Sequence, residues 1–351
     1  MKALSFDDIS LVPRYNNITS RRDVDTSVQF GDLKLRIPVF SSNMDTVTDA
    51  RMARRLHSLG GLGFLHRFCS IEDNAAMYYQ ARIAEPGNSH SPDAVVSLGV
   101  NEGLDRFHAL YEVGARYFCV DIAHGHSQPV GRLVEQIKQF DSSVFVVAGN
   151  VCENAGASYL ADKGADAIKV GIGPGSVCTT RRKSGFGIPQ FTAIRECHRV
   201  NCFVIADGGI RTPGDVVKAL YAGADAVMIG GMFAGCDETP GDFIEDTIWE
   251  SASPAGFLHR KVKVYRGMAS KEAQDEFMGS MHDWKTSEGV EIKVLAKGPV
   301  SDVVTDLMGG VRSGMTYCGA NELSQIRQRT YHVEVSAAGA AEGTAHGRNQ
   351  S

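Results

Sequence analysis

The sequence lacks the features by which several classes of protein are recognised. Its eight cysteines form no CxxC pair and have no metal-ligand spacing, so we expect reduced thiols rather than a disulfide framework or a zinc site. No apolar run approaches the roughly 20 residues that a membrane-spanning helix needs. The chain turns acidic at Asp7 and Asp8 without a signal-peptide core. These absences predict a cytoplasmic protein that does not bind membranes.

An excess of positive charge is also missing. The 351 residues carry a formal net charge of −5, which argues against general nucleic-acid binding. With 43% hydrophobic residues, the composition is that of a soluble globular enzyme with enough apolar surface for a core. The length allows one large domain or two ordinary ones.

Short apolar segments alternate with helical patterns along most of the chain. Apolar residues recur every three or four positions between several of these segments, which predicts helices. Continuous apolar strands separated by helices are typical of parallel sheets, and eight of them predict a (β/α)8 TIM barrel, an α/β fold. A doubly wound open sheet is the rival fold, disfavoured because no GxGxxG follows the first strand. The expected strands are residues 37–41, 63–65, 94–100, 117–120, 144–148, 167–170, 202–206 and 226–229.

The two ends of the chain and the segment after the eighth strand do not follow the barrel pattern, although we expect residues 1–351 to form a single barrel domain. Residues 1–34 read as an irregular lead-in. Residues 240–298 form an insertion after the eighth strand, which would lie over the active-site face as a flap or lid. A helix is expected at 269–277 within it, and further helices at 300–307 and 320–329. The tail, residues 337–351, is rich in alanine and glycine and is predicted to be disordered.

A glycine-rich loop, Gly171–Arg181, is the most informative stretch of the chain. Three glycines and a proline within five residues exclude helix and regular strand. Cys178 lies in this loop, just before Arg181, Arg182 and Lys183. Nearby positive charge favours the thiolate, which is the nucleophilic form of cysteine. We interpret Cys178 as a covalent catalyst; the alternative is an inert cysteine beside a tight turn.

Two other strand endings predict a site for a sugar phosphate. Asp207 ends one strand and is followed by Gly208 and Gly209, while Gly230 and Gly231 follow the last strand. Bare backbone N–H groups in the seventh and eighth loops of a barrel commonly bind a phosphate monoester. The Asp207 carboxylate would then accept hydrogen bonds from ribose hydroxyls, or else serve as a local turn acceptor. A nucleotide explains the carboxylate and the glycines together.

These motifs resemble the IMP dehydrogenase/GMP reductase family, and the resemblance runs from about residue 5 to about residue 335. The cysteine loop is its most specific part. The other matching segments, in the family's order, are residues 43–47, 207–209, 265–268, 288–289 and 312–317.

The two branches of the family run opposite chemistry on the same purine carbon, and four features resemble the reductase branch. The chain has no regulatory CBS pair between Ile83 and Ala94, and its flap segment, residues 282–289, lacks the Arg-Tyr pair with which dehydrogenases activate water. Asn43 and Ile122 also resemble reductases. Arg266 and the 312–315 segment resemble dehydrogenases instead, and a dehydrogenase without CBS domains, oxidising IMP to XMP with NAD, remains the alternative.

The reductase resemblance implies that Cys178 attacks C2 of GMP, that ammonia leaves, and that NADPH reduces the resulting thioimidate. Thr180 and Glu288 match the family's acid/base pair. The implied GMP-binding residues are Ser176, Asp207, Gly208, Gly209, Gly230, Gly231, Tyr265, Gly267, Met268, Ala269, Lys285 and Gly289.

The resemblance also implies sites for a cofactor and for a monovalent cation. For NADPH they are Ser20, Arg21, Arg67, Asp121, Ile122, Ala123, Ser313, Gly314, Met315 and Thr316, some of them supplied by a neighbouring subunit of a homotetramer. Arg21 could pair with a 2′-phosphate, which favours NADPH over NADH. Gly173, Gly175, Cys178 and Arg181 resemble the family's potassium site. His66, His124 and His126 do not have the spacing of a zinc site. A nucleotide-binding barrel without catalysis is a remote alternative.

Overall fold

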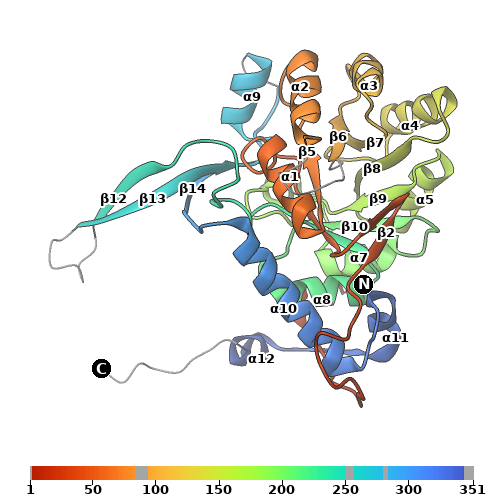
Figure 1. Ribbon diagram of the computed structural model, residues 1–351, viewed down its shortest axis with the longest axis vertical. Coiled ribbons are helices and arrows are strands. Elements are labelled where there is room, and N and C mark those ends of the chain that lie inside the picture. The colour runs from red at the N-terminus through yellow and green to blue at the C-terminus, as the bar shows by residue number, and fades with distance from the viewer. Residues whose placement is uncertain (1, 84–93, 250–256, 280–283, 344–351) are drawn as a thin grey trace.

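The computed structural model (Figure 1) describes residues 2–83, 94–249, 257–279 and 284–343. Eight parallel strands close into a barrel in the order β10-β11-β4-β5-β6-β7-β8-β9. Helices lie between the strands on the outside, as the sequence pattern predicted. The barrel strands are β4 (Val39–Ser41), β5 (Leu62–Leu65), β6 (Ala94–Leu98), β7 (Tyr117–Asp121), β8 (Phe145–Val151), β9 (Ala167–Val170), β10 (Phe203–Asp207) and β11 (Ala226–Ile229).

All eight strands occur where they were expected, with ends that differ by at most three residues. The largest extension is at β8, which continues through Gly149 and Asn150 to Val151. A glycine and a polar residue hide this end from a pattern based on apolar residues. β7 and β10 each continue onto a carboxylate, Asp121 and Asp207, because the carboxyl ends of the strands point into a polar cavity.

The outer helices begin and end at recognisable capping residues. In α8 (Pro213–Ala222), the Thr212 hydroxyl accepts a hydrogen bond from the Asp215 N–H, and the Asp215 carboxylate accepts one from the Thr212 N–H. Gly223 ends the helix at φ 119°, a left-handed conformation that only glycine adopts readily. The other outer helices are α1 (Ala50–Leu59), α2 (Ile71–Ala81), α3 (Gly103–Glu112), α4 (Gln128–Phe140), α5 (Asn154–Asp162), α7 (Gln190–Cys197) and α10 (Val300–Cys318).

A short hairpin closes the amino-terminal end of the barrel, where an irregular lead-in had been expected. Its strands β2 (Val28–Phe30) and β3 (Leu33–Leu35) pair antiparallel and place Phe30 beneath the barrel, fully buried. The Phe30 ring lies 5.1 Å from that of Phe40 and 4.5 Å from that of Phe145, measured between ring centroids. Strands of three residues are too short to stand out as a sequence pattern. A second small pair joins β1 (Ile9–Leu11) to β15 (His332–Glu334).

Replacing Phe30 by alanine should lower the free energy of unfolding by about 3–5 kcal/mol, because it leaves a large cavity among packed aromatic rings. Phe186→Ala is the matched control: Phe186 is 76% exposed, so its loss should change stability by less than about 0.5 kcal/mol. Urea unfolding followed by circular dichroism measures both. Equal effects of the two substitutions would contradict the role of Phe30 as a barrel plug.

The insertion after the eighth strand contains a sheet as well as the expected helix. β12 (Ile244–Trp249), β13 (Phe257–Arg266) and β14 (Glu291–Leu295) form a three-stranded antiparallel sheet that projects to one side of the barrel in Figure 1. α9 (Lys271–Met278) confirms the predicted helix. The strands were not predicted because charged residues interrupt them, as in the 259–263 segment.

The carboxyl-terminal region differs from expectation in three places. α10 continues to Cys318 instead of ending near Leu307, because its glycines Gly310 and Gly314 allow close packing on α8. The helix expected at 320–329 is limited to η2 (Leu323–Gln325) and α11 (Ile326–Arg329). Part of the tail predicted to be disordered is helical, α12 (Ala337–Glu342), since Ser336 caps a run rich in alanine, the strongest helix former. Residues 84–93, on which the short connection replacing a CBS pair falls, and 344–351 lie outside the described residues.

Candidate active site

A cavity of about 600 Å³ lies at the carboxyl ends of the barrel strands. The structure brings to it every residue predicted for catalysis and for the nucleotide, together with Arg67, Asp121, Ile122 and Ala123 of the cofactor set and all four residues of the cation set. The segment η1 (Phe6–Asp8) also borders it, through Phe6 and Asp7. Residues from widely separated parts of the chain therefore converge where the fold usually places chemistry.

The cysteine loop and the flap are joined by backbone hydrogen bonds. The Thr179 N–H donates to the Glu288 carbonyl at 2.8 Å, and the Val290 N–H donates to the Val177 carbonyl at 3.0 Å. Cys178 and Gly289 thereby face each other as in an antiparallel pair. This pairing brings Glu288 beside a loop more than 100 residues earlier in the sequence.

The Cys178 thiol lies next to a hydroxyl. Its sulfur is 3.2 Å from the Thr180 Oγ1 and can donate a hydrogen bond to it. Thr180 begins the short helix α6 (Thr180–Ser184) inside the loop, which was not predicted. A half-exposed thiol beside a hydroxyl and a carboxylate-bearing flap is equipped to form and break a bond to a ligand carbon.

Arg181 holds the loop in place instead of facing the thiol. Its guanidinium donates to the Ile188 carbonyl at 2.7 Å and packs against Gly173 and Gly187. A Cβ on Gly173 would lie 2.6 Å from the Arg181 Cγ, so only glycine fits there. Because a guanidinium cannot coordinate a cation, Arg181 can belong to a potassium site only through its backbone carbonyl.

A second part of the cavity is a cradle of backbone N–H groups and hydroxyls. Gly208 and Gly209 have φ values of 89° and 83°, which few residues other than glycine adopt. The Ser176 hydroxyl and the Tyr265 phenol lie 3.2 Å apart. A Cβ on Gly231 would lie 2.8 Å from the Ser176 Oγ, so these glycines keep the cradle open. With these open backbone N–H groups and two hydroxyls, this part suits a phosphate group.

Burial affects the Tyr265 phenol within this cradle. Tyr265 is 3% exposed, and its burial raises the pKa of the phenol above the ordinary value. The phenol therefore keeps its proton at neutral pH and can donate a hydrogen bond to a bound anion.

Sequence reasoning missed a buried lysine at the floor of the cavity. The Lys169 ammonium lies 2.7 Å from the Asp121 carboxylate and 2.7 Å from the Asp207 carboxylate. The Asn150 amide donates to the same oxygen of Asp207 at 2.9 Å. Lys169 stands between apolar residues in β9, and a charge inside such a strand is the sequence signal that a buried counter-ion must exist.

A second missed feature is the ion-pair cluster around Arg266, at the end of β13. Its guanidinium contacts the carboxylates of Asp45, Glu276 and Glu291, which belong to the loop after β4, to α9 and to β14. The Asp45 and Glu276 carboxylates outweigh the effect of burial and raise the pKa of Arg266. One cation thus joins the insertion to the barrel beside Gly267 and its neighbours in the cavity wall.

The remaining residues predicted for the cofactor do not line this cavity. Ser20 and Arg21 lie in the amino-terminal segment. Nearby, the backbone of Asp25 forms a parallel β-bridge with the backbone of Glu322, shortly after the end of α10. Ser313, Gly314, Met315 and Thr316 lie on α10 in the outer helical layer, where Gly314 packs against Val217 of α8. Within one chain, the structure does not bring these two groups to Cys178.

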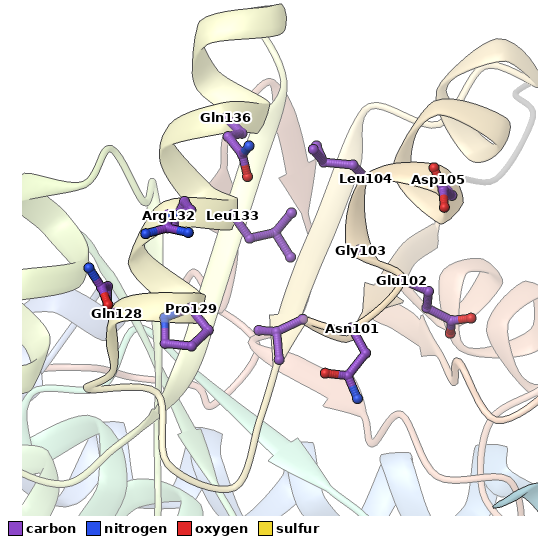
Figure 2. Close-up of a pocket in the computed structure, with 11 residues that line it drawn as sticks. Asn101, Glu102, Gly103, Leu104, Asp105, Gln128, Pro129, Arg132, Leu133 and Gln136 are labelled. Atoms are coloured by element: carbon purple, nitrogen blue, oxygen red, sulfur yellow. The ribbon is translucent and has the colours of Figure 1, made fainter.

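A smaller hollow of about 280 Å³ lies between the amino-terminal ends of α3 and α4. In Figure 2, Leu104 and Leu133 point into the gap between the two helices. The Glu102 carboxylate forms an ion pair with the Arg106 guanidinium at 2.8 Å. No residue predicted for the site lines this hollow.

In the described part of the chain, no group of histidines, cysteines, aspartates and glutamates is arranged to hold a metal ion, and His126 pairs with Glu153. All eight cysteines are free, as expected. Among the described helices, none has the length and apolar character needed to cross a membrane.

Comparisons with known proteins agree on one family. The family described as "IMP dehydrogenase / GMP reductase domain" matches residues 3–346. GMP reductases of Caenorhabditis elegans and Phytophthora infestans are each 36% identical to this chain over 349 residues, covering 95% of it and 92% and 91% of their own lengths.

Two solved structures are similar over almost the whole chain. One is a GMP reductase of Trypanosoma brucei in complex with guanosine 5′-monophosphate, with a TM-score of 0.88 and 30% identity, covering 99% of this chain and 98% of that one. The other is an inosine 5′-monophosphate dehydrogenase of Legionella pneumophila, with a TM-score of 0.82 and 46% identity, covering 96% of this chain and 100% of that one.

Proposed function

Because the chain belongs to the IMP dehydrogenase/GMP reductase family, we propose that it is a GMP reductase that converts GMP, NADPH and a proton into IMP, ammonia and NADP⁺. The observation that carries this proposal is the arrangement at Cys178. The Thr180 hydroxyl lies 3.2 Å from the Cys178 sulfur, and the Glu288 carbonyl in the flap accepts a hydrogen bond from the Thr179 N–H. GMP reductases among the curated relatives support the direction of the reaction.

Cys178 would act as the nucleophile. Its thiolate attacks C2 of the guanine, a carbon–sulfur bond forms, and the carbon–nitrogen bond to the exocyclic amine breaks, leaving a thioimidate. The amine leaves as ammonia only after it gains a proton, which Thr180 and Glu288 would supply. NADPH supplies the hydride that replaces sulfur on C2 and releases the thiolate.

The nucleotide would lie across the cradle and the buried carboxylate. Asp207 would accept hydrogen bonds from the ribose, while Ser176, Tyr265 and the glycine pairs at 208–209 and 230–231 hold the phosphate. Gly267, Met268 and Ala269 would border the base, with Lys285 and Gly289 from the flap.

The cavity is suited to a nicotinamide cofactor beside the nucleotide. Arg67, Asp121, Ile122 and Ala123 border it opposite the phosphate cradle, and the Arg67 Nε is buried without a hydrogen-bond partner in the described structure. A ligand acceptor would satisfy that donor. Ser20, Arg21 and residues 313–316 would reach the cofactor from a neighbouring subunit, with Arg21 near the 2′-phosphate, so we propose a homotetramer acting in purine salvage in the cytoplasm.

A monovalent cation would bind the turn that carries the cysteine. The carbonyls of Gly173, Gly175 and Cys178 carry little charge, which suits potassium better than a divalent ion. The Gly175 carbonyl already accepts the Cys178 N–H at 3.1 Å, so a cation bound there would stiffen the loop that presents the thiol.

A dehydrogenase remains the second candidate function, for two specific reasons. The Legionella pneumophila dehydrogenase is 46% identical to this chain, and Arg266 resembles the dehydrogenase branch. Against it, a dehydrogenase must hydrolyse its covalent intermediate, and the flap segment 282–289 holds no Arg-Tyr pair to activate water.

The assay that decides between them uses purified protein with GMP and NADPH, and separately with IMP and NAD⁺. We expect NADPH to be consumed with GMP, with one IMP and one ammonia formed for each NADPH. Formation of XMP from IMP and NAD⁺, with no reaction of GMP, would contradict the proposal and identify the dehydrogenase. Binding of GMP with no turnover in either assay would identify a non-catalytic nucleotide-binding barrel.

A further inference from the structure

Four successive barrel strands place polar side chains in contact at the floor of the cavity. Asp121 comes from β7, Asn150 from β8, Lys169 from β9 and Asp207 from β10. The Lys169 ammonium touches both carboxylates at 2.7 Å and is 2% exposed as a residue. Two carboxylates and one ammonium leave this cluster with a net negative charge.

Burying an ammonium is costly unless charged partners surround it, so the position of Lys169 requires both carboxylates. The dependence is mutual. Burial alone would raise the pKa of the Asp121 carboxyl, but Lys169, Arg67 and a hydrogen bond from Asn43 lower it below its ordinary value. Burial would likewise lower the pKa of Lys169, whereas Asp121 and Asp207 raise it. The Asp121 carboxyl and the Lys169 ammonium are therefore both ionised at neutral pH.

The two carboxylates serve different ligands in the function proposed above. Asp207 faces the ribose of the nucleotide and Asp121 lies in the part assigned to the cofactor, and both remain partly exposed, 19% and 22% as side chains. Without a cation between them, two carboxylates this close would repel each other or share a proton. Lys169 bonds to one oxygen of each and leaves the others for ligands.

We propose that Lys169 is a positioning residue that fixes the separation of the nucleotide-binding and cofactor-binding carboxylates, so that the two ligands bind side by side. The inference rests on the proposed function, since it takes the roles of Asp121 and Asp207 from it. Asn150 completes the arrangement: its amide donates to Asp207 and to the Gly171 carbonyl, and its Oδ1 is buried without a partner in the described structure. A ligand hydroxyl would satisfy that oxygen.

Lys169→Met tests the proposal, because it removes the charge and nearly keeps the length. We expect the dissociation constants for GMP and for NADPH, each measured alone by calorimetry, to rise by about 10- to 100-fold. The rate constant at saturating ligands should fall by a smaller factor than the product of the two increases in dissociation constant, since Lys169 touches neither reacting atom. A general loss of structure would lower the rate constant as well as both affinities, so this pattern distinguishes a positioning role from misfolding.

The pH dependence gives a second readout. The groups that face the cluster are Asp121, Asp207 and Cys119, with Arg67 and Tyr265 nearby. Lys169→Met removes the largest of the interactions that offset burial, so the pKa of the Asp121 carboxyl should rise and the carboxyl should be protonated at a higher pH than in the wild-type protein. The ratio of the variant to the wild-type dissociation constant for NADPH should therefore fall as pH rises. Taking the ratio removes the titration of the ligand's own phosphate.

Lys138→Met is the matched control. The Lys138 ammonium pairs with the Asp166 carboxylate at 2.9 Å, on the outside of the barrel and away from the cavity. It should leave both dissociation constants unchanged. If Lys169→Met does not fold, the double variant Asp121→Asn, Lys169→Met keeps the net charge of the cluster and should still bind GMP at least about tenfold more weakly.

The outcomes separate the two proposals. Wild-type protein that binds neither GMP nor NADPH would overturn the proposed function and this inference with it. The inference alone would be overturned if the wild-type protein binds both ligands and a folded Lys169→Met or double variant binds GMP and NADPH as tightly as the wild type does.

Discussion

Cys178→Ala should lower the rate of GMP reduction by about 10,000-fold or more, because in the proposed mechanism Cys178 forms the covalent intermediate through which both steps run. The alanine variant keeps the backbone hydrogen bond from residue 178 to the Gly175 carbonyl and leaves the phosphate cradle intact. Its dissociation constant for GMP should therefore stay within a few-fold of the wild-type value. Stopped-flow absorbance of NADPH measures the rate, and calorimetry measures the affinity.

Cys202→Ala is the control for this experiment. The Cys202 thiol donates to the Ala165 carbonyl far from the cavity, and burial raises its pKa, so it stays protonated and unreactive. Its loss should leave turnover unchanged. Turnover retained in Cys178→Ala would eliminate the covalent route, whereas loss of GMP binding would assign Cys178 a role in shaping the site.

Glu288→Gln should lower the rate constant by about 100- to 10,000-fold, the usual effect of removing a general acid or base. Glutamine keeps the size and the hydrogen-bonding ability of the side chain but cannot transfer a proton at neutral pH. The pairing of the flap with the cysteine loop uses the Glu288 backbone and should survive. Affinity for GMP should consequently change far less than turnover.

The control is Glu272→Gln, which neutralises an exposed carboxylate in the first turn of α9. Because this residue does not line the cavity, turnover should remain at the wild-type level. Normal turnover in Glu288→Gln would show that Glu288 is not the general acid or base and would leave that role to Thr180 alone. Rapid-quench measurements of ammonia release identify the step that is slowed.

The barrel could be predicted from the sequence because each of its strands is buried on both faces. Such strands are continuous apolar runs, and the sequence places β9 and β11 correctly to the residue. Glycines in the sequence revealed the loops at the carboxyl ends of these strands. These glycines are required by contacts close in the sequence, such as that of Gly173 with the Arg181 side chain. Local chemistry was thus enough to find the cavity wall.

The polar floor of the cavity could not be predicted, because it depends on which strands become neighbours. Lys169 has its partners 38 residues later and 48 residues earlier, and Arg266 has one of its partners more than 200 residues earlier. No periodicity within a segment encodes such pairs. The plug at Phe30 was missed for a related reason, since its three-residue strand is defined by the aromatic rings around it.

The seal formed by the β2–β3 hairpin makes this barrel a cup rather than a tube. With Phe30 closing the far end, anything that reaches Cys178 must come over the rim formed by the βα loops and the flap. In the proposed reaction, the nucleotide, the reductant and all three products would therefore pass over the same rim. The order in which they arrive and depart becomes part of the chemistry, and a compound lodged at the rim would exclude all of them at once.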